Sequence, residues 1–395
     1  MQKNNTMSGQ WKKRVLVIVE TSRGYGRNLI EGITKYAVEH RNWNFFLCDH
    51  DAACQDTRWL ETRQVDGLIA RCNHESIRAF FHNFPGKKIS LTTDDNTLPI
   101  YIRLNNEKCA QLAAEHFLSR GYENFAYFSI GHSVWSKYRY ECFAYVLQQH
   151  RLQCLLCPEA ERQTNRTLPT LWWSGLDDSV LGWIVSLPKP VAVLCANDHH
   201  AFYLANLCRF YGIGVPEEVA ILGVDNDESL CKATLPQLSS IDPNAKLIGY
   251  NAAAILDAMM NNETLPAESV SVEPACVIIR QSTDNTAVND PVLAHALQFI
   301  REEVARNLRV NEVAKEVGVS RGTLNTLFMQ HLNSTPLKEI LRVRMDWAKD
   351  LLRNTDGSIT EISQTVGYQT PEYFSRAFMR EVGVNPSTYR AEQNH

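Results

Sequence analysis

The chain has 395 residues, of which 44% are hydrophobic and 21% are charged, and its formal net charge is −4. This length predicts two or three domains, and the composition is that of an ordinary globular protein. The longest apolar runs, such as VLVIV from Val15, are far shorter than the roughly 20 residues that span a bilayer, and the N-terminus lacks the apolar stretch of a signal peptide. We therefore expect a cytoplasmic protein.

Residues 12–281 repeat one pattern, in which a short apolar run is followed by a stretch with helical spacing. Apolar runs predict strands at 14–20, 45–48, 66–70, 88–93, 101–104, 125–130, 191–197, 219–226 and 238–242, and helical spacing predicts helices at 26–40 and 106–121. Apolar strands separated by helices indicate parallel sheets covered on both faces. About a dozen such units favour two doubly wound α/β halves over a single sheet.

Polar residues gather where these strands end, and ligands of such folds bind at the carboxyl ends of strands. The residues concerned are Asn197, Asp198, Asp225 and Asp242, with Trp135, Arg139 and Tyr140 between two strands. Carboxylates, an amide and a guanidinium can bind vicinal hydroxyls, and aromatic faces cover the C–H side of a sugar. The alternative is that Asp and Asn here only form turns and cap helices.

Cysteine usage adds little chemistry. The 11 cysteines have no framework spacing, as expected of reduced thiols, and Cys154 and Cys157 have CxxC spacing in an apolar stretch without a second pair. We interpret these two as core or surface thiols and predict no metal, no cofactor and no catalytic residues.

Segments 101–129, 191–227 and 235–256 resemble the ligand-binding core of the LacI/GalR regulators, most specifically in Asn-Asp, Gly-Val-Asp-Asn and Leu-Ser-Ser-Ile. The resemblance implies a two-lobed fold like that of periplasmic sugar-binding proteins. It also implies an effector site made of Trp135, Arg139, Asn197, Asp198, Asp225 and Asp242. LacI regulators read DNA with an N-terminal domain, whereas here another part of the chain must do so.

Composition changes after the last cysteine, Cys276. Residues 282–291 are polar and rich in turn formers, which is typical of a linker, and residues 286–395 hold 13 basic and 13 acidic residues. We expect a sensor domain at 12–281, a linker at 282–291 and a second domain at 292–391.

The second domain contains one pattern twice, at about 310–331 and 359–381. In each copy a helix stripe ends at a glycine, Gly318 or Gly367, and a second helix follows a short turn. This is the helix-turn-helix pattern. The two glycines are 49 positions apart and Phe328 and Phe378 are 50 apart, so the second turn has one extra residue.

Residues 337–354 lie between the copies and have an apolar stripe at helical spacing, formed by Ile340, Val343, Trp347 and Leu351. A helix of this length is about 27 Å long at ~1.5 Å per residue. Such a rod can hold two reading helices about one DNA turn apart, so one chain can occupy two successive major grooves. The alternative is an ordinary set of packed helices, and the neutral net charge of the domain favours it.

Segment 367–390 resembles the C-terminal signature of the AraC/XylS family, and segment 341–352 resembles its linker helix, with resemblance over residues 290–391. The DNA-contacting positions that this implies are Ser320, Arg321, Thr323, Asn325, Thr326, Gln369, Thr370, Glu372, Tyr373, Arg376 and Arg380. The first reading helix has Asn325, Thr326 and Gln330 with a single arginine, which leaves its base preference open, because Asn and Gln suit adenine and Arg suits guanine.

We therefore expect a transcription regulator that binds operator DNA under the control of a sugar, with D-xylose as the first candidate from the resemblance. Its partners would be double-stranded DNA, the sugar, a second copy of the chain bound through the sensor domain, and RNA polymerase for an activator. Three alternatives stay open: a regulator of another pentose or hexose pathway, a sugar-binding or sugar-metabolising enzyme with a helical appendage, and an interaction protein whose sensor has lost its ligand. The sequence contains no GxxxxGK[ST], GxSxG or HExxH motif that would support the enzyme.

Overall fold

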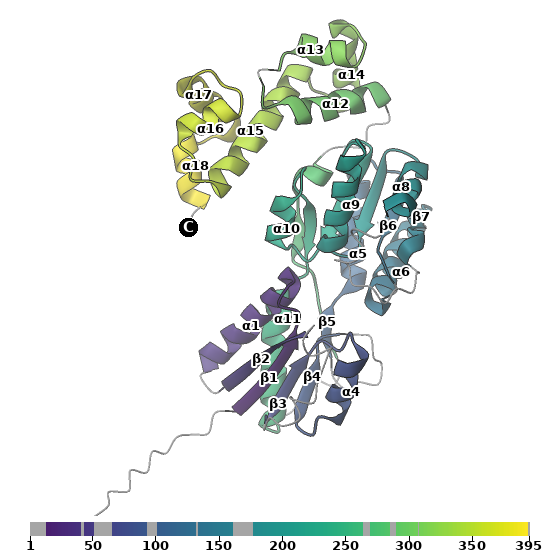
Figure 1. Cartoon of the computed structure of the whole chain (residues 1–395), viewed down its shortest axis with the longest axis vertical. Coiled ribbons are helices and arrows are strands. Elements are labelled where there is room, and N and C mark those ends of the chain that lie inside the picture. The colour runs from purple at the N-terminus through teal and green to yellow at the C-terminus, as the bar shows by residue number, and fades with distance from the viewer. Residues whose placement is uncertain are drawn as a thin grey trace, which may run out of the picture. The chain divides into compact units, whose positions relative to one another are not determined.

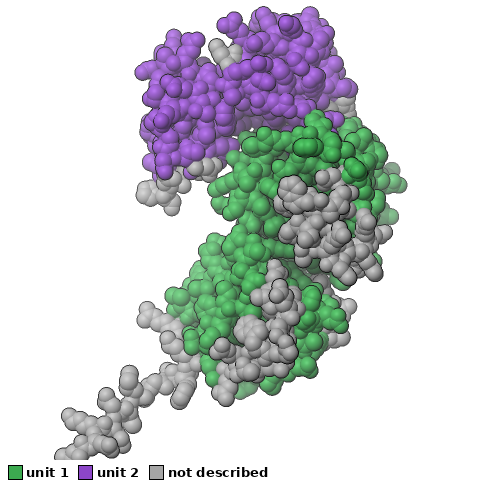
Figure 2. Space-filling model, in the orientation of Figure 1, with its two compact units in different colours: residues 1–212, 220–284 green, residues 213–219, 285–395 purple. Residues whose placement is uncertain are grey.

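The computed structural model describes residues 13–40, 43–50, 65–92, 101–131, 133–160, 177–263, 269–284, 290–306 and 308–393. The chain forms two compact units (Figure 2). The first comprises Met1–Gly212 and Ala220–Asp284, and the second comprises Ile213–Val219 and Asn285–His395. Residues 285–289, half of the expected linker, lie outside the described residues.

The first lobe of unit 1 has a four-stranded parallel sheet in the order β2-β1-β3-β4 (Figure 1). Its elements are β1 (Lys13–Val19), α1 (Gly24–His40), β2 (Trp43–Asp49), β3 (Gly67–Ala70), α4 (Glu75–Asn83) and β4 (Lys87–Ser90). Central β1 is buried from Val15 to Val19, as its uninterrupted apolar sequence predicts.

The second lobe has a six-stranded sheet in the order β12-β10-β9-β8-β6-β7. Its strands are β6 (Asn124–Phe128), β7 (Cys154–Leu156), β8 (Val191–Cys195), β9 (Val219–Val224), β10 (Ser239–Asp242) and β12 (Cys276–Ile278). Its helices are α5 (Asn106–Leu118), α6 (Val134–Gln149), α8 (Asp177–Ser186), α9 (Asp198–Phe210) and α10 (Glu228–Ala233), with short 3₁₀ turns at Pro158–Ala160 and Gln281–Thr283.

The two α/β halves confirm the predicted architecture, with two differences at the strands that connect the lobes. β5 (Ile102–Leu104) pairs with β11 (Val270–Val272) in a small sheet of its own, and β12 joins β10 antiparallel. Both differences arise because the chain passes back and forth between the lobes, so strands far apart in sequence meet at the crossings.

Helix α11 (Ala245–Met260) returns from the second lobe to pack along α1 and against β3 and β4 of the first. The contact depends on two glycines. A Cβ on Gly32 would lie 1.9 Å from the carbonyl oxygen of Lys246, and a Cβ on Gly249 would lie 2.1 Å from that of Leu29. Only glycine lets the two backbones approach this closely.

Unit 2 is helical, apart from its segment Ile213–Val219. It contains α12 (Pro291–Glu303), α13 (Val310–Glu316), α14 (Arg321–Leu332), α15 (Pro336–Asn354), α16 (Ile359–Thr365), α17 (Pro371–Val382) and α18 (Pro386–Gln393). The turns between paired helices are residues 317–320 and 366–370, so the predicted extra residue in the second turn is confirmed. Gly318 and Gly367 end their helices with φ of 71° and 84°, values that favour glycine.

The long helix α15 belongs to two hydrophobic cores. Ile340 packs with Phe328 and residues of α12 to α14, whereas Met345, Ala348 and Leu352 pack with Phe378 and residues of α16 to α18. The joining helix is therefore confirmed. The predicted stripe is only partly so, because Val343, Trp347 and Leu351 are partly buried. A helix that serves two cores buries different faces at its two ends.

No helix in the part of the chain that the structure describes is both long and apolar enough to cross a membrane.

Candidate effector pocket and DNA-reading helices

A pocket in unit 1 collects side chains from both lobes and from the crossing between them. Its described lining consists of Arg23, Tyr25, Arg71, Leu91, Thr92, Arg103, Leu104, Asn106, Trp135, Arg139, Asn197 and Asp225. These residues follow β1, β3, β4, β6, β8 and β9, or belong to the crossing around β5. The pocket thus lies at the carboxyl ends of parallel strands, where ligands of this architecture bind.

An ion pair orients the first-lobe side of the pocket. Arg71 donates from Nη1 to Oε2 of Glu20 at 2.9 Å, and its guanidinium lies 5.0 Å from the ring centre of Tyr25. Burial tends to raise the pKa of Glu20, but Arg71, His50 and Arg23 outweigh it and hold the pKa below its usual value. Glu20 is therefore a buried anion that holds Arg71 at the pocket wall.

On the second-lobe side, α6 supplies a guanidinium and an indole. Arg139 is buried, donates from Nε to the side-chain oxygen of Asn106 at 2.9 Å, and donates from Nη1 to the carbonyl of Ala196. Its guanidinium lies 5.4 Å from the ring centre of Trp135. These contacts hold a hydrogen-bond donor next to a flat apolar face. A sugar has hydroxyl groups that can accept from the donor and a C–H face that can pack on the ring.

Asp225 sits in a strained turn directly after β9. Its φ is 116°, a value that a residue with a side chain rarely adopts. Three successive backbone N–H groups hold the turn: Asp225 donates to Ile241 O at 3.0 Å, Asn226 to Ser240 Oγ at 3.0 Å, and Asp227 to Asp198 Oδ2 at 2.7 Å. Burial raises the pKa of Asp225 to about 6, although Arg139, Arg71 and Arg23 favour its charged form.

The structure places Asp198 behind the pocket rather than on its described lining. Its carboxylate is fully buried and accepts hydrogen bonds from Ser240 Oγ at 2.6 Å and from the backbone of Asp227. Burial raises its pKa well above the usual value, and the nearby charge of Asp225 adds to the effect. In this position Asp198 supports the turn that carries Asp225, and its contact with the effector stays a prediction.

The other predicted effector residues divide in the same way. Trp135, Arg139, Asn197 and Asp225 lie on the lining, whereas Asp242 does not and accepts the backbone N–H of Asn244 at 2.8 Å. Asn197 also caps α9, since its side-chain oxygen accepts from the backbone N–H of His200 at 3.1 Å. The capping alternative is thus true of Asn197 and leaves its amide nitrogen to the pocket.

Sequence reasoning did not find Arg23, Arg71 or Arg103. Each stands at or near a strand end on its own, without a repeated or acidic pattern to single it out. Nε of Arg103 is buried and has no hydrogen-bond partner within the described residues. A basic residue directly after a predicted buried strand is the signal that could have found Arg71.

The cysteines predicted as structural lie away from this pocket's lining. Cys157 is buried, and burial raises the pKa of its thiol to about 12. No group of three or more His, Cys, Asp or Glu that could hold a metal occurs among the residues that the structure describes.

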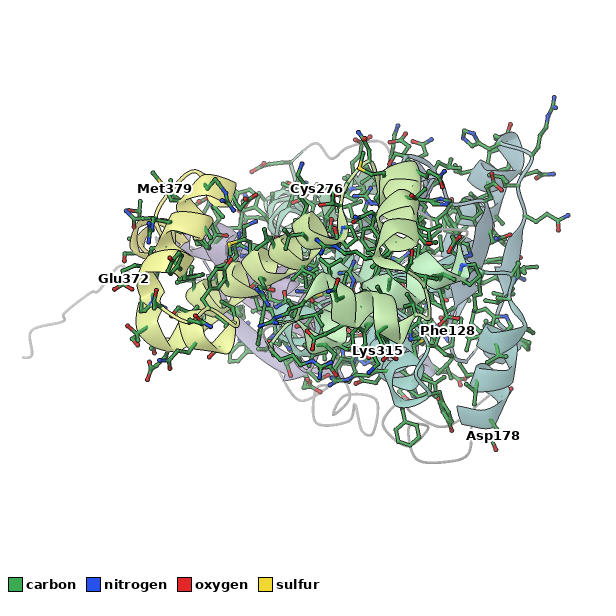
Figure 3. The ribbon with its side chains drawn as sticks, turned by 90° about the horizontal axis from the view of Figure 1, so that it is seen from above. Phe128, Asp178, Cys276, Lys315, Glu372 and Met379 are labelled. Atoms are coloured by element: carbon green, nitrogen blue, oxygen red, sulfur yellow. The ribbon has the colours of Figure 1, made fainter. Side chains whose placement is uncertain are left out.

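The two reading helices of unit 2 bury side chains at matching positions. Leu324 and Phe328 of α14 are buried, as are Phe374 and Phe378 at the matching positions of α17. The exposed positions also match, and they are Gly322, Thr323, Thr326, Met329 and Gln330 in α14, and Glu372, Tyr373, Arg376, Met379 and Arg380 in α17. Figure 3 shows Glu372 and Met379 at the outer edge of the yellow helices.

Three of the predicted DNA-contacting residues form hydrogen bonds at the start of α14. Ser320 caps the helix, because its Oγ accepts from the backbone N–H of Thr323 at 3.0 Å and contacts the Thr323 hydroxyl at 2.8 Å. The Thr326 hydroxyl donates to Gly322 O at 3.1 Å. Arg321 is exposed at the first helical position, and Asn325 is half-buried. The outward face of α14 beyond Arg321 is therefore uncharged.

The start of α17 is more charged. Thr370 caps it by accepting from the backbone N–H of Tyr373 at 3.4 Å, and Gln369 before it is exposed. The Arg376 guanidinium lies 4.8 Å from the ring centre of Tyr373, and Arg380 pairs with Glu381 at 3.0 Å. These contacts extend both arginines along the exposed face of the helix.

Comparisons with known proteins agree with this division. Residues 114–283 match the periplasmic binding protein-like domain family, and residues 313–392 match a helix-turn-helix domain family. The chain is an AraC-type transcription regulator with a periplasmic-binding-protein-like sensor domain. It therefore acts as a regulator and not as an enzyme.

Similar curated proteins cover nearly the whole length of this regulator or about a quarter of it. It is 25% identical to the xylose operon regulatory protein of Haemophilus influenzae over 97% of this chain and 99% of that protein. The protein of the same name from Escherichia coli K12 is also 25% identical, over 96% and 97%. The lactose operon transcription activator of Staphylococcus xylosus is 35% identical over 26% of this chain and 37% of its own length.

A solved structure of a xylose-binding transcription activator superposes on this regulator with a TM-score of 0.82 at 24% identity, covering 96% of this chain and 98% of that one. This likeness shows that the two proteins share a fold from the sensor to the reader.

Proposed function

We propose that D-xylose is the effector of this sugar-sensing regulator, and that it controls an operon for sugar utilisation in the cytoplasm. The observation that carries the proposal is the convergence of Asp225, Asn197, Arg139 and Trp135 on one pocket. Support for the choice of sugar comes from the two full-length relatives, which are xylose operon regulatory proteins.

The pocket offers each kind of group that a pyranose needs. Asp225 accepts hydrogen bonds from neighbouring hydroxyls, Arg139 and Arg71 donate to hydroxyl or ring oxygens, and Trp135 covers the C–H face. Tyr140, the other aromatic residue predicted near the site, is absent from the described lining. Trp135, Leu91 and Leu104 supply the apolar wall, which favours a pentopyranose over a hexopyranose with its extra hydroxymethyl group.

The reader binds double-stranded operator DNA through α14 and α17, with Arg321, Arg376 and Arg380 as the principal charged contacts. The other predicted DNA-contacting residues lie at the starts and exposed faces of the same helices, except for the half-buried Asn325. We also propose a homodimer formed through the sensor domain and, for an activator, contact with RNA polymerase.

A calorimetric titration of the full chain with D-xylose, L-arabinose, D-ribose, D-glucose and D-galactose tests the choice of effector. D-xylose should bind most tightly and raise the melting temperature most at equal concentration, since a ligand that binds only the folded state stabilises it. Stronger binding of either hexose would overturn the proposal for xylose, and binding of none of the five would remove the sugar effector. The variant Asp225→Ala serves as the control for binding in this pocket.

A further inference from the structure

The segment Ile213–Val219 lies within the sensor sequence but packs with the second compact unit. In the chain it lies between α9 and β9 of the sensor, yet it belongs to the compact unit that contains the reader. It forms a tight turn, because Gly214 O accepts the backbone N–H groups of Glu218 at 2.9 Å and Val219 at 3.0 Å. Oε2 of Glu218 in turn accepts from the backbone N–H of Gly214 at 2.8 Å. A turn closed by three hydrogen bonds moves as one piece.

This turn packs on α12 through a buried ion pair. Nε of Arg301 lies 2.7 Å from Oε1 of Glu217, and the two side chains are 14% and 1% exposed. One turn earlier on the same helix, Gln298 faces Gly214, where an added Cβ would lie 3.1 Å from the Gln298 side-chain oxygen. Within the second unit, therefore, α12 is held by the turn at two successive positions of one helix face.

The ion pair is poorly suited to a purely stabilising role. Oε2 of Glu217 and Nη2 of Arg301 are both buried without a hydrogen-bond partner in the described part of the chain. Removing charges from water is costly, and apolar residues of similar volume would hold such a contact as well or better. A buried, incompletely satisfied ion pair instead makes a contact that depends strongly on geometry, because small displacements of either group leave a charge unpaired.

The chain connects this pair directly to the effector pocket. β9 begins at Val219, two residues after Glu217, and ends at Val224, one residue before Asp225. All six residues of β9 are buried, and the strand is hydrogen-bonded between β8 and β10. A central strand of this kind transmits a shift along its length, because its neighbours prevent it from bending.

The other partner of the pair leads to the first reading helix. Ile300, which precedes Arg301, packs in the same hydrophobic core as Leu297 of α12 and as Leu324 and Phe328 of α14. A change in the position of Arg301 therefore alters the helix against which α14 is packed.

We propose that Glu217 and Arg301 are positioning residues that couple occupancy of the effector pocket to DNA binding. Neither residue lies on the described lining of the effector pocket or in α14 or α17. The inference rests on the proposed sugar response, and it adds the route by which Asp225, through β9 and the turn, acts on α12 and α14.

The test measures the affinity for sugar and the affinity for operator DNA, and from these it derives how strongly sugar changes DNA binding. Calorimetry gives the dissociation constant for sugar, and fluorescence anisotropy gives operator affinity without sugar and with saturating sugar. The sugar is D-xylose or, if another sugar of the titration series binds more tightly, that sugar. The ratio of the two operator affinities is the coupling. Because a purely structural role would lower stability without changing this ratio, the ratio is the decisive quantity.

Glu217→Gln should leave the sugar affinity and the sugar-free operator affinity within about threefold of the wild type, while the coupling ratio falls to near one. The exchanged pair Glu217→Arg with Arg301→Glu should regain part of the coupling. Glu302→Gln, at an exposed neighbouring position on α12 where the Glu302 carboxylate accepts from Gln298 at 3.0 Å, should keep the full ratio and serves as the matched control.

The double variant Glu217→Leu with Arg301→Met guards against loss of folding, since an apolar pair avoids leaving one charge buried alone. It should fold, bind sugar and operator, and show no coupling. A folded double variant with the wild-type coupling ratio would overturn the inference. That result differs from failure of the proposed effector, which the wild-type titration alone would reveal.

Discussion

The carboxylate of Asp198 accepts a hydrogen bond from the backbone N–H of Asp227 at 2.7 Å, and this contact holds the strained turn in which Asp225 stands. A buried acid behind the pocket thus positions the acid on its wall. Gly223 makes room for it, because a Cβ there would lie 2.0 Å from Oδ1 of Asp198.

Two replacements of Asp198 should show separately how much its hydrogen bonds and its charge contribute to the free energy of unfolding. Asp198→Ala leaves the Asp227 N–H and the Ser240 hydroxyl buried without their acceptor, and we expect the free energy of unfolding to fall by about 3 kcal/mol. Asp198→Asn should cost only about 1 kcal/mol, because its amide oxygen can still accept from Asp227 and burial already disfavours the charge. Urea denaturation of both variants checks this, and equal losses would show that the charge itself matters.

Asp225 should be needed for the sugar response and not for DNA binding. Asp225→Ala removes a charged acceptor for a buried hydroxyl, which costs roughly 1.5–3 kcal/mol, or about 10- to 100-fold in sugar affinity. Operator affinity in the absence of sugar should stay unchanged. Calorimetry and a gel-shift assay measure the two quantities, and an unchanged sugar affinity would remove Asp225 from the site.

Arg139→Ala should weaken sugar binding at least as much as loss of Asp225, because one guanidinium can donate to two oxygens. Part of the loss would be structural, since Arg139 also donates to Asn106 and to Ala196. Arg139→Lys keeps the charge and loses the paired donors. Sugar affinity near the wild-type value in the lysine variant would show that only charge is required.

Sugar affinity should depend on pH through Asp225, whose pKa burial raises to about 6. If the bound sugar requires the carboxylate, affinity is constant above pH 7 and falls by up to tenfold per unit below about pH 6, because a proton must first leave. For the ligand-free chain the sign is opposite. A raised carboxyl pKa means that this group's contribution to stability increases as pH falls through 6.

Calorimetry between pH 5 and pH 8 measures this dependence. Asp225→Asn is the control, and its weaker affinity should be the same across the range. A wild-type affinity that stays constant down to pH 5 would show that the sugar binds the protonated carboxyl equally well.

The DNA contacts of the two reading helices should differ in their dependence on salt. The outward face of α17 carries Arg376 and Arg380, whereas that of α14 has Arg321 alone. Loss of a phosphate contact by Arg376→Ala or Arg380→Ala should lower the slope of log affinity against log salt by about one unit, evenly across sequences. Arg321→Ala should cost about 1–3 kcal/mol and relax one base position if it reads guanine.

Binding to a randomised operator library at two salt concentrations distinguishes these outcomes. Thr388→Ala on α18 is a suitable control, since α18 lies outside both reading helices. A double variant Arg321→Ala with Arg376→Ala that binds like the wild type would show that the repeated helices do not read DNA.

The sequence predicts the nine strands that stand out as apolar runs, and it misses β7, β11 and β12, which have only three residues each. It predicts both reading helices because glycine and the burial period repeat. It could not separate Asp198 from Asp225, since both follow buried strands and only the three-dimensional fold shows which carboxylate faces the pocket. Arg71 escaped prediction because its partner, Glu20, is 51 positions away. The close approach of α1 and α11 likewise depends on Gly32 and Gly249, which no local pattern connects.

The sharing of α15 by two cores constrains how this regulator can evolve. One inserted residue in the middle of the helix would turn the second core by about 100° relative to the first and move it by about 1.5 Å. Insertions are therefore tolerated only in whole turns, of three or four residues. Under the proposed binding of α14 and α17 to successive major grooves, the length of this one helix would set the base-pair interval between two operator half-sites, and operators with a different interval would require a relative with a longer or shorter α15.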